Sequence, residues 1–212
     1  AEKMPHQIAL ASPRGSHTLG TKRPYKTQTF TDLELNTSSI AAGLQQLGVR
    51  PGMRIVMLVR FGADFIALVF ALLKVGAVVV LVDPGMGRKN LLRCLEATEP
   101  EGFIAIPMGH LVRMLFRHRF RKARLNVTVG HRWGLLPRPT LAELASCPSS
   151  LFEPPPTTLD SQAAIIFTTG STGPPKGVLY THRTFNSQVD ALIGHYGIAP
   201  GGCDLSGFPL FG

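Results

Sequence analysis

The long apolar run Phe65–Val82 limits the folds that this chain can adopt. Its 18 residues, FIALVFALLKVGAVVVLV, approach the length of a transmembrane helix. Lys74 and Gly76 interrupt the run, and its composition changes there from Ala, Leu and Phe to almost pure Val. β-Branched residues favour strands, and an uninterrupted apolar strand is typical of a parallel sheet. The run therefore predicts a buried helix followed by a buried strand, in preference to a membrane span.

Helical and strand-like segments alternate on both sides of this run. Thr31 and Glu34 have capping-box spacing and predict the start of a helix that Gly48 ends. Further strands are predicted at 54–59, 102–106 and 125–129, and further helices at 89–97 and 183–195. This alternation is typical of βαβ units. The predicted fold class is α/β, with a mostly parallel sheet covered by helices.

The chain divides at a stretch rich in proline and serine, 146–158, which lacks hydrophobic periodicity and predicts an exposed connection. It separates a first α/β portion, 1–145, from a second portion, 159–212. Since 44% of the 212 residues are hydrophobic, the chain can bury a substantial core. The sequence stops on the apolar LSGFPLFG, so we expect it to be part of a longer protein.

The formal net charge of +9 comes largely from one segment. Six of the 22 basic residues fall between Arg113 and Arg124, in RMLFRHRFRKAR, with no acid among them. As a helix, this segment would be amphipathic, with Leu111, Met114 and Leu115 on one side. A solvated helix face, an anionic membrane surface and an acidic partner all remain open interpretations. Nucleic acid is the least favoured, because no recognisable nucleic-acid module accompanies the segment.

The cysteines predict neither a disulfide framework nor a zinc site. Cys94, Cys147 and Cys203 are widely spaced and form no C-x-x-C pair. The first residues, AEKMPHQIAL, lack the basic and then apolar layout of a signal peptide. We therefore expect a cytoplasmic protein, with peripheral membrane contact if Arg113–Arg124 binds lipid.

The stretch IIFTTGSTGPPKGVLYTH, Ile165–His182, places glycines, hydroxyl groups and a lysine between two apolar runs. It is not a Walker P-loop, because Pro175 and Gly177 stand where a glycine and a hydroxyl residue are required. The prolines and the strand-forming residues after Gly177 favour a loop between two strands. Its backbone amides, hydroxyl groups and Lys176 suit a polyphosphate, although a plain hairpin connection would share much of this composition.

The same stretch closely resembles the phosphate-binding signature of the adenylate-forming (AMP-binding) enzymes, which include acyl-CoA synthetases, luciferases and peptide-synthetase adenylation domains. The family's usual form is T-S-G-[ST]-T-G-x-P-K-G-V followed shortly by T-H. Thr169, where serine is usual, is the one departure. Upstream, TFTDLELNTSSIAAGLQQLGVRPGMRIVMLV and ALVFALLKVGAVVVLVDP resemble the family's early helix-strand blocks, with Met53 in place of a common aspartate. The resemblance covers most of 29–212.

In that family a substrate carboxylate attacks the α-phosphorus of ATP, pyrophosphate leaves, and an acyl-adenylate forms. The resemblance thus implies ATP and Mg²⁺, and an incomplete N-terminal AMP-binding domain over 1–212. It also implies that Lys176 pairs with the β- and γ-phosphates, which would be wrapped by Thr168, Thr169, Gly170, Ser171, Thr172 and Gly173. The family's adenine-binding segment, magnesium-binding acid and catalytic lysine lie further downstream. No catalytic residue is therefore assigned, and we expect this chain alone to be inactive.

Two segments point to one branch of the family. VDPGMGRKNLLRCLEATEPEGFIAIP and IAPGGCDLSGFPLFG resemble the branch that makes β-lactones from long-chain β-hydroxy acids in bacterial olefin biosynthesis. This implies ring closure with release of AMP and without coenzyme A. An acyl-CoA synthetase that uses coenzyme A is one alternative, and a non-catalytic nucleotide-binding or scaffold domain is another.

By resemblance to the same family, Phe208 and Phe211 are expected in the acyl pocket or in the core. His182 is expected to fix a strand-to-helix turn, and Tyr180 to pack.

Overall fold

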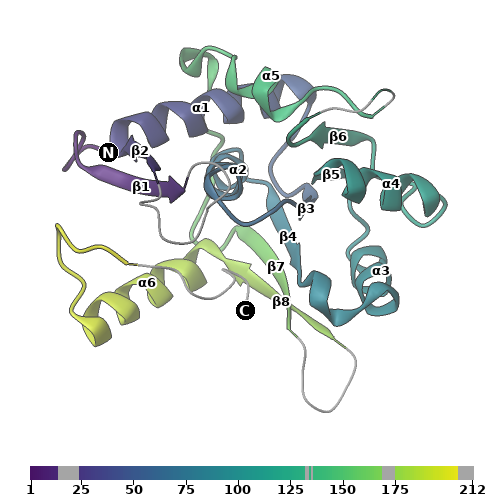
Figure 1. Cartoon of the computed structure of the whole chain (residues 1–212). Coiled ribbons are helices and arrows are strands. Elements are labelled where there is room, and N and C mark those ends of the chain that lie inside the picture. Colours follow the sequence, from purple (N-terminus) through teal and green to yellow (C-terminus); the bar gives the residue numbers. More distant parts are fainter. Residues whose placement is uncertain (14–23, 132–133, 135, 169–174, 205–212) are drawn as a thin grey trace.

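The computed structural model in Figure 1 describes residues 1–13, 24–131, 134, 136–168 and 175–204. Its strands are β1 (Ile8–Pro13), β2 (Tyr25–Thr29), β3 (Arg54–Leu58), β4 (Val78–Val82), β5 (Gly102–Ala105), β6 (Leu125–Thr128), β7 (Gln162–Thr168) and β8 (Lys176–Thr181). Its α-helices are α1 (Phe30–Leu47), α2 (Ala63–Lys74), α3 (Arg88–Ala97), α4 (Pro107–Leu115), α5 (Leu141–Ala145) and α6 (His182–Tyr196). Two short 3₁₀-helices are η1 (Pro84–Met86) and η2 (Ser149–Leu151).

Six of the described strands form one sheet, in the order β6-β5-β3-β4-β7-β8. The neighbouring pairs from β6 to β7 are parallel, and β8 pairs with β7 in the antiparallel direction. β1 and β2 form a separate antiparallel pair. The predicted fold class, α/β with a mostly parallel sheet covered by helices, is confirmed. So is the prediction that the glycine-rich loop connects two strands.

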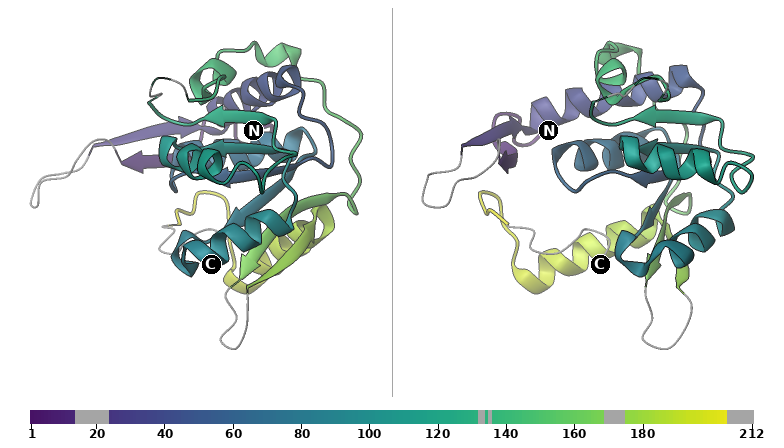
Figure 2. Two further views of the ribbon diagram at one scale, coloured as in Figure 1. Left: turned by 90° about the vertical axis from the view of Figure 1, so that its right-hand side faces the viewer. Right: turned by 45° about the vertical axis from the view of Figure 1, so that its right-hand side comes forward.

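Helices cover both faces of this sheet (Figure 2), and β4 shows how its side chains divide between them. Val79 and Leu81 belong to the hydrophobic cluster that includes residues of α1, α2 and α5. Val80 and Val82 belong to a second cluster, which includes α3 and the turn after α4. Because successive side chains of a strand point to opposite faces, a strand covered on both sides needs an uninterrupted apolar run.

The apolar run Phe65–Val82 forms a helix and then a strand, as predicted. α2 ends at Lys74, Gly76 adopts a left-handed φ of 70°, and β4 begins at Val78. The described helices include none with the length and hydrophobicity of a transmembrane segment.

The start of α1 differs from the prediction. The capping box is formed by Thr29 and Asp32: the Asp32 amide donates to Thr29 Oγ1 (3.1 Å), and the Thr29 amide donates to Asp32 Oδ2 (2.9 Å). Thr29 ends strand β2 with an extended backbone (φ −75°, ψ 169°), which is the conformation an N-cap residue requires. The predicted pair lies inside the helix, and its Glu34 forms an ion pair with Lys74 instead. The predicted C-terminus is confirmed, with Gly48 in a left-handed conformation.

The predicted basic helix is shorter than expected. α4 ends at Leu115, so of the basic residues between Arg113 and Arg124 only Arg113 is helical. The chain then forms turns that bring Phe120 and Ala123 into the core cluster of the α3 face. Burying these two side chains removes apolar surface from water, and this stabilises the turns over the continued helix that the sequence pattern predicted.

Two parts of the structure lie outside the predicted elements: the largely exposed pair β1–β2 and α5, which has only five residues. The predicted connection 146–158 contains the short η2. The connection 146–158 is nevertheless attached to α1. The Gln45 side-chain amide donates to the Glu153 carbonyl (2.6 Å), and the Glu153 amide donates to Gln45 Oε1 (3.2 Å).

Candidate functional site

The candidate site is built on the antiparallel pair β7–β8. The register places Thr168, the last residue of β7, opposite Lys176, the first residue of β8, and the next pair is Phe167 with Gly177. Lys176 is exposed, and within the described ranges no carboxylate forms an ion pair with it. The ladder therefore fixes the backbone of Lys176 and leaves its ammonium group available to an anion.

The structure brings together the two ends of the predicted phosphate-binding set. Thr168 and Lys176 close the ladder, while Thr169, Gly170, Ser171, Thr172 and Gly173 lie outside the described residues. Phe208 and Phe211, predicted for the acyl pocket or the core, also lie outside them. The roles of all these residues stay predictions.

The position of β7 in the sheet favours ligand binding at the end of the strand. β7 runs parallel to β4, with Phe167 beside Val82, so both strands end at the same edge. In open α/β sheets, ligands bind beyond the carboxyl ends of the parallel strands. The turn after β4 lies at this edge, where Asp83 Oδ1 accepts a hydrogen bond from the Gly85 amide (2.7 Å). That carboxylate therefore stabilises its own turn.

The opposite end of the pair is fixed by the start of α6. The Arg183 guanidinium donates to both carboxylate oxygens of Asp160 (2.8 and 3.0 Å) and holds the pKa of Asp160 below its ordinary value. The amides of His182 and Arg183 donate to the carbonyls of Ser161 (3.2 Å) and Leu159 (2.7 Å). These contacts join the residues before β7 to the start of α6. No sequence motif predicted the Asp160–Arg183 pair.

Tyr180 and His182, two residues with aromatic rings near this junction, differ in how their rings are packed and hydrogen-bonded. Tyr180 stacks on Phe185, with ring centroids 5.3 Å apart, which agrees with a packing role. His182 fixes the turn through its backbone. Its ring nitrogen Nε2 is buried and has no hydrogen-bond partner among the described residues. His182 thus presents an unsatisfied polar atom at the base of α6.

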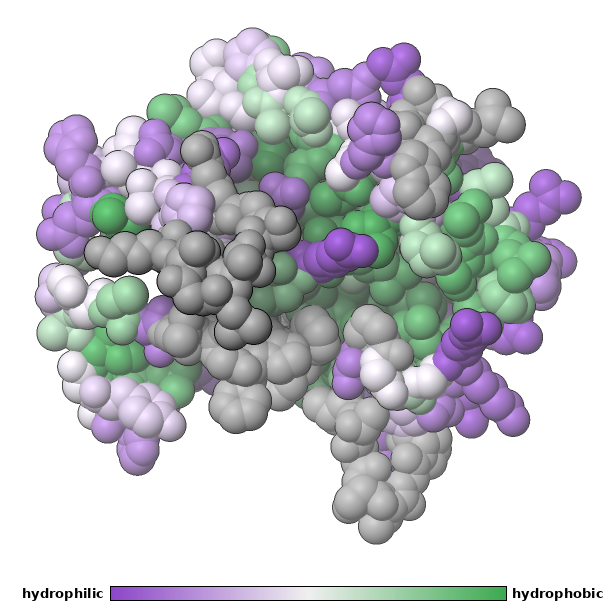
Figure 3. Space-filling model, in the orientation of Figure 1, coloured by the Kyte–Doolittle hydropathy of each residue, from purple (hydrophilic) through white to green (hydrophobic). Residues whose placement is uncertain are grey.

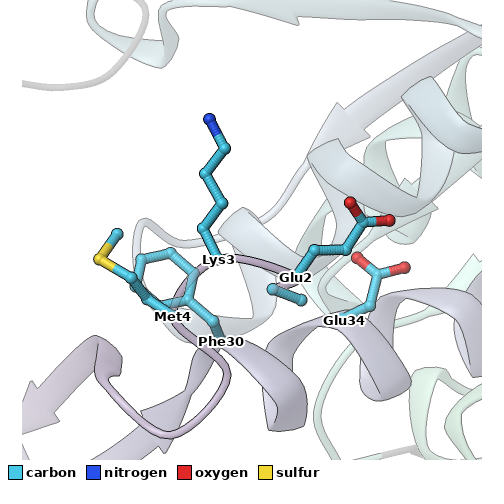
Figure 4. A pocket seen from close by; sticks show the side chains of 6 residues that line it. Glu2, Lys3, Met4, Phe30 and Glu34 are labelled. Carbon is cyan, nitrogen blue, oxygen red and sulfur yellow. The ribbon is translucent and has the colours of Figure 1, made fainter.

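Two hollows in the described surface lie away from the β7–β8 ladder. One, of about 530 Å³, is lined by Ala1–Met4, Phe30 and Glu34. Figure 4 shows the carboxylates of Glu2 and Glu34 on the same side of it, with Lys3 pointing away. The other, of about 640 Å³, lies beyond the ends of β3, β5 and β6 and includes Val59, Ile106 and Val129. Neither hollow contains a predicted phosphate-binding residue.

The described part of the chain contains no metal site, and its cysteines are free thiols. No group of three His, Cys, Asp or Glu residues there could hold a metal ion, so we assign no magnesium ligand to it. Cys94 is buried, and burial raises the pKa of its thiol. Cys147 is half-buried and Cys203 is exposed.

The chain belongs to the AMP-binding enzyme family, whose model matches residues 1–207. It is 42% identical to an olefin beta-lactone synthetase of Xanthomonas campestris pv. campestris and 41% identical to one of Stenotrophomonas maltophilia. Each alignment covers 100% of this chain and 38% of the relative, so the chain spans well under half the length of these proteins.

Solved structures support the same fold. A long-chain-fatty-acid-CoA ligase from Archaeoglobus fulgidus superposes with a TM-score of 0.77 at 22% identity, over 93% of this chain and 38% of that one. At this identity the likeness shows the fold. The mostly parallel sheet flanked by helices thus agrees with the family that the model match shows.

Proposed function

We propose that the protein to which this chain belongs activates a carboxylic acid with ATP, forming an acyl-adenylate and releasing pyrophosphate. The observation that carries this proposal is the signature between Thr168 and Lys176, which in an AMP-binding enzyme joins two strands at the carboxyl edge of the sheet. ATP use is what an AMP-binding family member would require.

The loop would act on the leaving group. A carboxylate oxygen attacks the α-phosphorus, the bond from that phosphorus to the bridging oxygen breaks, and pyrophosphate departs with the negative charge. Thr168, Thr169, Gly170, Ser171, Thr172 and Gly173 would donate hydrogen bonds to the β- and γ-phosphates. Lys176 would neutralise the charge that develops there. Magnesium ion bound with ATP would supply further charge neutralisation at the phosphates.

The second step would close a four-membered ring. The β-hydroxyl oxygen of a long-chain β-hydroxy acid attacks the activated carbonyl carbon, the bond from that carbon to AMP breaks, and the hydroxyl proton is released. The names of the two relatives, both olefin beta-lactone synthetases, support this reading. Phe208 and Phe211 would line the acyl pocket. The domain organisation would be that of a partial N-terminal AMP-binding domain, and the location cytoplasmic.

A second candidate function is that of an acyl-CoA synthetase, in which coenzyme A takes the acyl group. This candidate is kept because the chain has the same fold as part of a long-chain-fatty-acid-CoA ligase. A non-catalytic nucleotide-binding or scaffold domain is the third candidate, and the assay below distinguishes it from the two enzymes.

One assay separates these functions. The complete protein is incubated with ATP, magnesium and a long-chain β-hydroxy acid, with and without coenzyme A, and AMP and acyl products are measured. We expect AMP and a β-lactone without coenzyme A. Strict dependence on coenzyme A would favour the synthetase, and the absence of acid-dependent AMP formation would favour a binding domain.

A further inference from the structure

The exposed side of α4 carries large apolar side chains. Met108, Leu111, Met114 and Leu115 are all exposed, Leu115 to 74%, and positions 108, 111 and 115 recur at helical spacing. The helix turns His110 to the interior, where it is fully buried. In Figure 3 a green area lies over α4 with purple side chains beside it. We call these four exposed residues the apolar side of α4.

A group of cations follows directly after α4. We call it the basic turn, and its exposed members are Arg117, Arg119, Arg121, Lys122 and Arg124. Arg119 pairs with Glu96 (3.0 Å) and Lys122 with Glu99 (3.1 Å). Among the described residues no carboxylate pairs with the other three arginines. Two of five charges are thus compensated by direct ion pairs, and three remain open to an anionic partner.

Two buried residues hold the basic turn against the protein. Phe120 packs edge-on against Phe103, with ring centroids 5.1 Å apart, and Ala123 is buried in the same cluster. These anchors alternate with the exposed cations along the segment. Because the backbone is already ordered by the core, binding to a partner would cost less conformational entropy than binding through a free tail.

We propose that the apolar side of α4 and the basic turn together bind the surface of an anionic lipid bilayer. The cations would attract anionic headgroups, and the neighbouring apolar side chains would enter the boundary between headgroups and acyl chains. Nucleic acid would use the cations through its phosphates and would leave Leu111 and Leu115 in water. The combination of the two chemistries therefore favours a bilayer.

Vesicle co-sedimentation of the complete protein tests this proposal. We expect binding to phosphatidylcholine vesicles that contain about 30% phosphatidylserine, little binding to phosphatidylcholine alone, and loss of binding in about 0.5 M salt. Arg117→Gln/Arg121→Gln should weaken binding roughly 25-fold, at about fivefold per cation. Leu115→Ser should weaken it roughly tenfold, because its side chain would no longer enter the apolar boundary. Leu115 is mostly exposed, so this change should leave folding intact.

The matched control removes two charges elsewhere. Lys3→Gln/Lys26→Gln changes two exposed lysines near the β1–β2 pair and should leave vesicle affinity within about twofold. Absence of vesicle binding, equal binding to neutral vesicles, or insensitivity to Arg117→Gln/Arg121→Gln would overturn the proposal. The proposal would also be overturned if the protein bound double-stranded DNA as tightly as anionic vesicles and Leu115→Ser did not change its affinity for DNA. Because the assay contains neither ATP nor acid, its outcome is independent of the proposed adenylation.

Discussion

The ring of Phe167 lies against Gly177, its direct partner across the β7–β8 pair. A Cβ atom added to Gly177 would lie 3.0 Å from Phe167 Cζ and 3.1 Å from Cε1. Phe167 is itself buried in the core cluster of the α3 face. Because Gly177 has no side chain, the ring of Phe167 can pack directly before Thr168, where the predicted phosphate loop begins. Lys176 precedes Gly177 on the paired strand.

Enlarging Gly177 should disturb this ladder. We expect Gly177→Val to lower the free energy of unfolding by about 1–3 kcal/mol, because the added side chain would meet the Phe167 ring and Ile165 Cγ2 at close range. Gly177→Ala should cost less, and part of its cost should disappear in the Phe167→Leu background, where the ring is removed. Urea unfolding of the four proteins in a double-mutant cycle measures the coupling. Additive effects would contradict the contact.

Two helical glycines should respond in opposite directions to alanine. In α1, a Cβ at Gly43 would lie 2.8 Å from Leu144 Cδ2 and 3.0 Å from Leu144 Cα, so Gly43→Ala should destabilise the protein by about 1–3 kcal/mol.

In α6, Gly194 has open space around it, and Gly194→Ala should stabilise the protein by about 0.5–1 kcal/mol through helix propensity. Equilibrium unfolding measures both. Stabilisation by Gly43→Ala would show that α1 and α5 are less closely packed.

The buried His110 should make the protein sensitive to mild acid. Burial lowers the pKa of His110, whose Nε2 lies 2.9 Å from the Val127 carbonyl. The unfolded chain therefore binds the proton first, at an ordinary pKa of about 6.5. Stability should fall as the pH drops below that value, down to the lowered pKa of the folded state.

Replacement of the histidine isolates this effect. In His110→Gln, the free energy of unfolding should change less between about pH 6.5 and 5 than in the wild type, since glutamine does not titrate. His6→Gln, at an exposed position, is the control. An unchanged pH dependence in His110→Gln would mean that another group causes the acid sensitivity.

The sequence predicted the central strands well because β3, β4 and β5 are buried on both faces. The uninterrupted apolar run of β4 and the change of composition at Gly76 are strong local signals. The capping box of α1 was misplaced, since the sequence offers two pairs with the same spacing. The choice of Thr29 depends on its extended backbone at the end of β2. The early end of α4 was not predicted either, because it depends on the burial of Phe120, which is a tertiary contact.

At the candidate site the sequence predicted the loop and its flanking strands but not their supports. Pro175 and Gly177 excluded a Walker arrangement, and the antiparallel ladder agrees. The Asp160–Arg183 pair and the contact between Phe167 and Gly177 join residues that are 23 and 10 positions apart and lack any motif. Such pairs follow from strand register, which a single sequence does not specify.

Acid-dependent exchange of pyrophosphate into ATP measures whether Lys176 binds the phosphates of ATP. In the complete protein, we expect Lys176→Ala to lower the exchange rate by about 10²–10³-fold, since the charge on the leaving group loses a cation. Unfolding should not change, because Lys176 is exposed, and Lys26→Ala serves as the control. Exchange by Lys176→Ala at the wild-type rate would contradict a phosphate-binding role of Lys176.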